Sequence, residues 1–205
     1  MAYRRGLLAS LVILLFGLAA AAPLAQSNGR RFEAAGHIGV AASNEFDESD
    51  VGVGGRITWM PLAMVGVDAE ILHYPSDYPD GVAFSRARWE GFFGATVGPR
   101  LGRWRPFATL RPGFVTYREA PEPIACIAIF PPPLACTLAS GRSVLAFDLG
   151  GGMDVDVAQW SVIRLEISDR LLRYAGPVFD GNRTRRDGNF WGHGLRVSVG
   201  AGIRF

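Results

Sequence analysis

The residues of this chain whose types could do chemistry are three histidines, two cysteines and a large set of carboxylates and arginines. The histidines, His37, His73 and His193, are scattered, and no spacing pairs two of them as metal ligands or one of them with a serine. His193 and Ser198 do not occupy adjacent positions on the same face of one strand. We therefore predict no catalytic residue, no metal ligand and no cofactor, and we expect a protein that is not an enzyme.

Acidic and basic residues recur at alternate positions, separated by apolar or small residues. Such carboxylates could act as general acids and bases, but opposite charges on one face of a narrow interior more often neutralise each other. An unpaired buried charge costs several kcal/mol or changes its protonation. We predict interior ion pairs made by Glu33, Arg56, Asp68, Glu70, Arg86, Arg88, Glu90, Arg111, Asp148, Asp154, Arg164, Glu166 and Arg196.

The N-terminal segment has the composition of an export signal. Arg4 and Arg5 precede an apolar run over residues 7–22, which ends in four alanines. We assign residues 1–25 to a cleavable signal peptide and residues 31–205 to one domain, with a retained single-helix anchor as the alternative. Removing the two signal arginines from the 21 basic residues leaves 19, against 19 acidic ones, so the mature chain is neutral and no nucleic-acid partner is expected.

The rest of the chain alternates between apolar and polar or small residues, which is the two-residue period of a strand with two different faces. No helical period competes over these windows. We predict an all-β fold, an eight-stranded antiparallel up-and-down transmembrane β-barrel. Its strands are expected near residues 32–40, 51–60, 65–72, 86–97, 108–114, 145–155, 163–168 and 195–205. Pro112 lies inside the fifth strand and predicts a bulge there.

The expected connections alternate between short and long. Short connections fall near 60–64, 98–103 and 157–161, and longer ones near 43–50, 75–83, 119–142 and 174–189. A barrel that begins and ends in the periplasm has this alternation, with tight periplasmic turns and long outer loops. In the last outer loop, Arg183, Arg185 and Arg186 either contact lipopolysaccharide phosphates or are simply solvated.

The cysteines lie in the longest of these outer loops. Cys126 and Cys136 flank an apolar, proline-rich run over residues 127–135. In an exported protein, two cysteines in one loop favour a disulfide, whereas two ligands without a nearby histidine make an incomplete metal site. We predict a Cys126–Cys136 disulfide. This disulfide would close residues 126–136 into a ring. The apolar tip of the ring is either a contact surface for a partner or lipid, or a loop folded on itself.

Alternation alone does not say which face is outside, because a soluble barrel has the same period in the opposite sense. Three features favour a lipid-facing apolar side: opposite charges and glycines share the other face, the chain ends on an aromatic residue, and aromatic rings lie near strand ends. These rings, expected at the level of the lipid head groups, are Trp59, Tyr74, Trp104, Tyr117, Trp160, Tyr174, Trp191 and Phe205.

The signal segment, the eight alternating strands and the final strand Leu195–Phe205 resemble the small outer-membrane β-barrel family related to the OmpA transmembrane domain and OmpX. The resemblance covers about residues 31–205 and implies a location in the bacterial outer membrane. It also implies that Phe205 acts as a signal to the assembly machinery. The periplasmic peptidoglycan-binding domain of OmpA-type proteins is not matched, so cell-wall anchoring is not carried over.

The sequence is compatible with three functions. The leading hypothesis is a non-enzymatic structural or surface-interaction protein whose lumen is plugged by ion pairs, with outer-membrane lipid, lipopolysaccharide and an unknown extracellular partner as its contacts. The second is a narrow pore for water, ions or small solutes. The third is a lipid-modifying enzyme.

Overall fold

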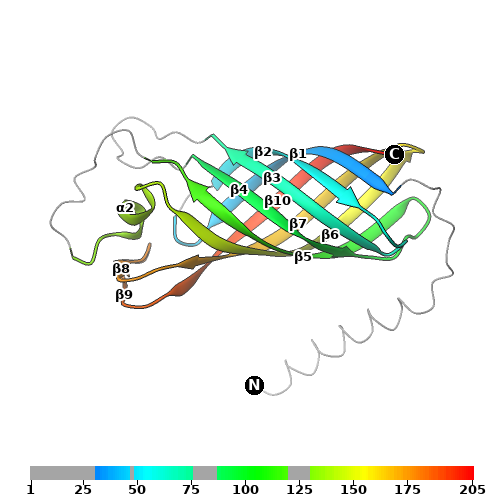
Figure 1. Ribbon diagram of the computed structural model, residues 1–205. Coiled ribbons are helices and arrows are strands. Elements are labelled where there is room, and N and C mark those ends of the chain that lie inside the picture. The colour runs from blue at the N-terminus through cyan, green and yellow to red at the C-terminus, as the bar shows by residue number, and fades with distance from the viewer. Residues whose placement is uncertain (1–30, 47–48, 76–86, 120–129) are drawn as a thin grey trace, which may run out of the picture.

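The computed structural model describes residues 31–46, 49–75, 87–119 and 130–205. Eight antiparallel strands close into a barrel in the order β1-β10-β7-β6-β5-β4-β3-β2, which confirms the predicted fold class (Figure 1). These strands are β1 Phe32–Ser43, β2 Ser49–Trp59, β3 Val65–Tyr74, β4 Arg88–Val97, β5 Trp104–Tyr117, β6 Ser143–Ala158, β7 Ser161–Tyr174 and β10 Phe190–Arg204. Within the described ranges, no helix is both long enough and apolar enough to cross a membrane.

The first and last barrel strands close the sheet. β1 and β10 pair from Glu33 opposite Arg204 to Ser43 opposite Gly194. Beyond the strand end, Phe32 and Phe205 exchange two backbone hydrogen bonds of 3.0 and 2.9 Å. Closure leaves neither strand with an unpaired edge, which a membrane-spanning sheet requires because hydrocarbon offers no hydrogen-bond partner.

The two faces of the wall differ as the alternation predicts, and β7 is a clear case. Ile163, Leu165 and Ile167 face outward with 41, 51 and 53 % of their surface exposed. Arg164 and Glu166, between them, face inward and are buried. Successive side chains of a strand point to opposite faces, so one register puts the apolar set outside and the ionic set inside.

The barrel has two different ends. The end with the C-terminus carries the turns 60–64, 98–103 and 159–160, and we call it the turn end. The opposite end, the loop end, carries the other connections, including the helix α2 Leu134–Leu138 and the short strands β8 Val178–Phe179 and β9 Arg185–Arg186 (Figure 1). The sequence did not predict these three short elements. The first outer connection, 44–48, is also shorter than expected, because β1 and β2 extend beyond their predicted ends.

The interior near the loop end is apolar, and here one prediction was wrong. Tyr74, Tyr117 and Tyr174 were expected at the lipid head groups but lie inside the barrel, 0, 5 and 1 % exposed. The strands run further than predicted, so each tyrosine takes the inward position that its two-residue period assigns. These tyrosines pack in one buried cluster with Leu134 and Leu138 of α2.

The other aromatic residues of that set are exposed. Trp59, Trp104, Trp160 and Phe205 are 45 to 61 % exposed and belong to the turn end, and Trp191, 46 % exposed, lies near the loop end. Amphipathic rings of this kind are enriched where a membrane wall meets water. The four rings at the turn end agree with an expected aromatic belt, whereas at the loop end Trp191 is the one member of the predicted set on the outer face.

The predicted bulge at Pro112 is not present. Between β4 and β5, Phe92 pairs with Gly113 and Ala95 with Leu110, so the register is the same on both sides of the proline. Pro112 itself pairs with Phe147 on β6 without a shift. In an antiparallel strand the backbone bonds alternate between the two neighbours, so the missing N–H interrupts one ladder without displacing the strand. The register shift that does occur lies in β6, between Asp156 and Ala158.

Candidate functional site: the ionic interior

Among the described residues, eight buried arginines and eight buried carboxylates line the interior of the barrel, so the formal charges of this set balance. They are Arg56, Arg88, Arg105, Arg111, Arg164, Arg170, Arg196 and Arg204, with Glu33, Asp50, Asp68, Glu70, Glu90, Asp148, Asp154 and Glu166. Equal numbers matter because an uncompensated charge in a low-dielectric interior costs several kcal/mol. The contacts form three groups along the axis.

The central group joins five strands. Arg111 on β5 donates through Nη1 to Glu70 Oε2 on β3 at 2.7 Å and through Nε to Asp148 Oδ2 on β6 at 3.0 Å. Arg196 on β10 reaches Glu70 Oε1 at 2.5 Å and Asp148 Oδ2 and Glu166 Oε1 at 3.1 Å each. Arg111 also contacts Glu166 on β7. Two guanidinium groups thus bridge three carboxylates across the full width of the interior.

A second group lies toward the turn end. Arg164 Nε donates to Asp154 Oδ1 at 2.5 Å, and Arg105 Nη1 donates to Asp154 Oδ2 at 3.3 Å. Arg204 Nε donates to Glu33 Oε2 at 2.9 Å, which ties the last strand to the first. This group therefore links β1, β5, β6, β7 and β10 with ionic contacts as well as with the backbone ladder.

A third group lies below the tyrosines at the loop end. Arg88 donates to Asp50 Oδ2 at 2.5 Å and to Glu90 Oε1 at 2.9 Å, and Arg170 also contacts Glu90. The Arg88 guanidinium lies 4.1 Å from the centroid of the Tyr74 ring. A cavity beside these charges has a volume of only about 20 Å³, enough for about one water molecule.

Nearly all of the residues predicted to line the interior lie there. Arg86 falls outside the described residues, and the other twelve predicted residues are buried. The prediction missed Asp50, Arg105, Arg170 and Arg204, which extend the same alternation to the strand ends. For Asp50, Arg105 and Arg170 the predicted strands stopped too early, although the two-residue period was a usable signal. Arg204 lay within the predicted last strand, 195–205, but was not counted among the interior ion pairs.

The three histidines lie on three different strands, β1, β3 and β10. His37 is inside, with Nε2 3.8 Å from Glu70 Oε1, and His73 stacks on Trp89 at 4.3 Å. On the outer face, His193 Nδ1 lies 3.0 Å from Asp169 Oδ2, a pair that the sequence analysis did not identify. In the part of the chain that the structure describes, no serine hydroxyl hydrogen-bonds to any of these rings, and no three metal-binding side chains are grouped.

Only one of the two cysteines of the predicted disulfide lies within the described residues. Cys136 lies in α2, and Cys126 falls outside the described residues. The pairing of the two thiols therefore stays a prediction.

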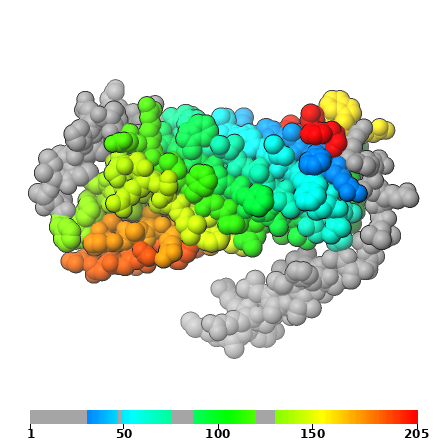
Figure 2. All heavy atoms as spheres, viewed as in Figure 1, coloured from blue at the N-terminus to red at the C-terminus, as the bar shows by residue number. Residues whose placement is uncertain are grey.

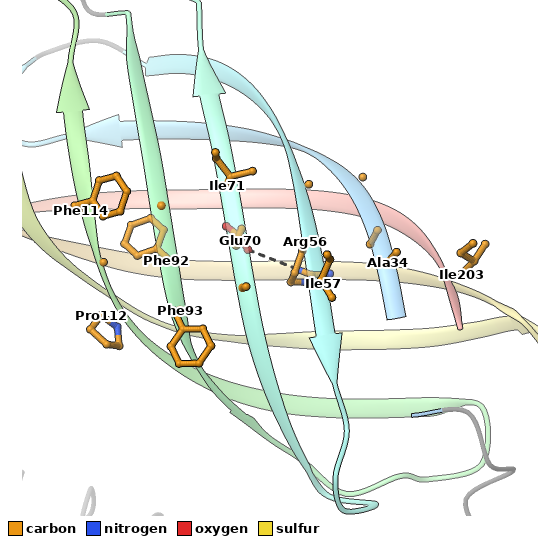
Figure 3. A pocket seen from close by; sticks show the side chains of 16 residues that line it. Ala34, Arg56, Ile57, Glu70, Ile71, Phe92, Phe93, Pro112, Phe114 and Ile203 are labelled. Carbon is orange, nitrogen blue, oxygen red and sulfur yellow. Dashed lines mark ion pairs between the residues drawn. The ribbon is translucent and has the colours of Figure 1, made fainter. Parts of the chain in front are cut away.

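The outer wall also carries a shallow hollow of about 860 Å³ over β1 to β5. Figure 3 shows its rim, formed by Ile57, Ile71, Phe93 and Phe114, on the side of the wall opposite the Arg56–Glu70 ion pair. Its floor is made of alanine and glycine. The hollow belongs to the apolar wall, and the charged members of its lining, Arg56 and Glu70, are buried residues that pair with each other in the interior.

An apolar exterior, an aromatic belt at the turn end and an interior whose described charges balance define this class of protein: a small membrane-type β-barrel. A scan against protein-family models finds no match, and a search of curated proteins finds none either. Among solved structures, Neisserial surface protein A matches with a TM-score of 0.56 and 10 % identity over 85 % of this chain and 97 % of that one. The fold is that of a small outer-membrane barrel, as the resemblance implied, and it supports an outer-membrane location.

Two further structures match with lower TM-scores and slightly higher sequence identities. Ail of Yersinia pestis, solved with a heparin analogue, has a TM-score of 0.47 and 15 % identity over 86 % of this chain and 99 % of that one. OprG of Pseudomonas aeruginosa has a TM-score of 0.45 and 14 % identity over 86 % of this chain and 96 % of that one.

Proposed function

We propose that this chain is a non-enzymatic integral outer-membrane protein with a structural or surface-interaction role, and that ion pairs plug its lumen. The observation that carries the proposal is the central group, in which Arg111 and Arg196 bridge Glu70, Asp148 and Glu166 across the interior. A small solute would have to break several charge-assisted contacts to pass.

The loop end supports the same proposal. Leu134 and Leu138 of α2 pack with Tyr74, Tyr117 and Tyr174 above the ionic groups. This apolar cluster therefore forms a second barrier between the charged interior and the outside. Figure 2 shows the described residues of this end in yellow-green and orange, opposite the red C-terminus. We expect the exposed parts of these loops to meet lipopolysaccharide or an extracellular partner.

Single-channel recording in planar bilayers tests the plug. We expect the refolded protein to give no sustained conductance, and we expect Arg111→Ala to raise the frequency of openings. Arg173→Ala, which removes an exposed arginine of β7, is the matched control. Sustained unit conductance of the unaltered protein that changes with Arg111→Ala and not with Arg173→Ala would overturn the proposal.

A narrow water-filled pore is the second candidate, because several buried polar atoms have no partner within the described protein. Thr58 Oγ1, Asp68 Oδ1 and Arg105 Nη2 are examples. Buried polar atoms are normally satisfied by protein or ordered water. Swelling of protein-loaded liposomes in a salt-free osmotic gradient measures water permeation directly, and swelling faster than that of empty liposomes would favour this candidate.

A lipid-modifying enzyme is the least supported candidate. The His193–Asp169 pair supplies a base and an orienting acid on the outer face, but a hydrolytic triad also needs a nucleophile. We expect no turnover when the purified barrel is incubated with lipid A or phospholipid. Turnover that is lost in His193→Gln would overturn the non-enzymatic proposal.

Phe205 is proposed to act in assembly. It follows β10, is 61 % exposed and stacks on Phe32 at 6.1 Å between ring centroids. We expect Phe205→Ala to lower the amount of protein in the outer-membrane fraction. Refolding of the purified variant in detergent should be little changed, which would separate recognition by the assembly machinery from stability.

A further inference from the structure

A pocket of about 550 Å³ lies at the loop end, outside the barrel interior. Its apolar lining comes from three connections that are far apart in sequence: Phe46 after β1, Leu134 and Ala135 in α2, and Phe179 in β8. In Figure 1, α2 and the β8–β9 hairpin lie at the same end of the barrel. The volume falls within the range of about 300–1,000 Å³ that is usual for small-molecule sites.

The walls of this loop pocket are held together by contacts between the connections. Phe179 N donates to the carbonyl oxygen of Pro132 at 3.0 Å, which joins the hairpin to the segment before α2. The amide of Gly181 donates to Glu45 Oε2 at 3.1 Å, which joins the hairpin to the first outer connection. A pocket shaped before its ligand arrives loses less conformational entropy on binding.

The charged groups of the hairpin are mostly neutralised within it. Arg185 pairs with Asp187 at 2.7 Å, and Arg186 pairs with Asp180 at 2.9 Å. Asp180 Oδ1 also accepts from the amides of Asn182 and Thr184, at 3.1 and 2.7 Å.

Arg183 differs from the two neighbouring arginines. It lines the loop pocket, and its guanidinium has no carboxylate partner among the described residues. The φ of Arg183 is 58°, a left-handed conformation that non-glycine residues rarely adopt and that is held here by its amide bond to the Asp180 carbonyl at 2.9 Å. The lining has two other charged groups, and both already have partners: Glu45 accepts the Gly181 amide, and Asp180 pairs with Arg186.

We propose that the loop pocket binds an amphiphile with a hydrocarbon chain and an anionic head group. The chain contacts Phe46, Leu134 and Phe179, and the head group pairs with Arg183. A guanidinium beside an apolar surface recognises a carboxylate, sulfate or phosphate by charge-assisted hydrogen bonds. The carboxylates of Glu45 and Asp180 in the lining oppose a second negative charge, so a singly charged head group fits best. This proposal rests on the loop end facing outward, as the proposed function has it, but it does not depend on whether the lumen conducts.

Calorimetric titration of the protein in nanodiscs, with the heat of empty nanodiscs subtracted, tests the head-group preference. The probes are octanoate, octanol and octyltrimethylammonium, which share a chain length and differ in charge. We expect saturable binding of octanoate, weaker binding of octanol and no binding of the cation. Equal binding of all three, tighter binding of the cation, or no saturable binding of octanoate would overturn the proposal.

Matched variants locate the site. Arg183→Gln is expected to weaken octanoate binding about tenfold, the effect of losing roughly 1.4 kcal/mol of charge-assisted bonding. Ala135→Phe fills the pocket from α2 and should abolish binding. Arg185→Gln removes an arginine of the same hairpin that is already paired, and it should bind as the unaltered protein does.

Each variant is first shown to migrate as a folded barrel on a gel without boiling. Unchanged octanoate binding in folded Arg183→Gln or Ala135→Phe would contradict the assignment. A conducting lumen together with normal octanoate binding would leave this inference intact and overturn only the proposed plug.

Discussion

Arg111 on β5 and Glu70 on β3 are 41 residues apart in sequence, yet Nη1 of the arginine donates to Oε2 of the glutamate at 2.7 Å. Their strands are not neighbours, because β4 lies between them in the sheet. The contact therefore crosses the interior of the barrel rather than running along its wall. The Arg111–Glu70 contact depends on closure of the sheet and on both side chains lying at the same height along the barrel axis.

The first prediction concerns the loss of one partner of this contact. Arg111→Met should lower the free energy of unfolding by about 3–5 kcal/mol, because Glu70, Asp148 and Glu166 would be left under-compensated. Arg173→Met removes an exposed arginine and should change it by less than about 0.5 kcal/mol. Urea unfolding followed by tryptophan fluorescence measures both. Equal effects of the two substitutions would show that the interior charges are not energetically coupled.

The second prediction compares two adjacent glycines of β2 that face opposite sides of the wall. A Cβ on inward-facing Gly54 would lie 2.4 Å from the Ile71 carbonyl oxygen and 2.8 Å from His37 Nε2. A Cβ on outward-facing Gly55 would meet nothing closer than 3.8 Å. Gly54→Ala should therefore destabilise the barrel by about 1–3 kcal/mol, while Gly55→Ala should be neutral or slightly stabilising. Similar losses in both variants would argue against this register.

The third prediction concerns pH and the β8–β9 hairpin. The pKa of Asp180 is lowered, because partial burial, which raises it, is outweighed by the Thr184 amide bond and by Arg186. A carboxylate with a depressed pKa stabilises the folded hairpin at pH values above its unfolded pKa, and this contribution is lost as pH falls through the folded pKa.

Amide hydrogen exchange at Thr184, measured between pH 7 and pH 3 and corrected for intrinsic rates, tests this linkage. In the unaltered protein, protection of the Thr184 amide should decrease as the pH is lowered. In Asp180→Asn it should be lower at pH 7 and nearly independent of pH. The same pH dependence in both proteins would assign the effect to another group.

The fourth prediction concerns the thiols of the longest loop. Cys126 and Cys136 should resist alkylation in the unfolded, unreduced protein and react fully after reduction, as a disulfide requires. Mass spectrometry of a tryptic digest checks the linkage. Cys136→Ser should leave barrel migration on gels unchanged, because Cys136 lies in the loop helix rather than in a barrel strand. Quantitative alkylation before reduction would disprove the disulfide.

The sequence by itself determined the faces of the wall. Arg164 and Glu166 alternate with Ile163 and Leu165, and the direction of a side chain from a strand is set by its own backbone. This local rule holds wherever the strand continues. Tyr74 and Arg170 follow it as well, although they lie beyond the predicted strand ends, where the composition resembles that of loops.

Only the tertiary structure decided which charges meet and what the loops build. The Arg111–Glu70 contact requires the register of β3, β4 and β5, and the loop pocket brings Phe46, Ala135 and Arg183 together from three connections. Contacts between distant segments depend on how every strand between them is paired and tilted. No local period contains that information, because it is set by closure of the whole sheet.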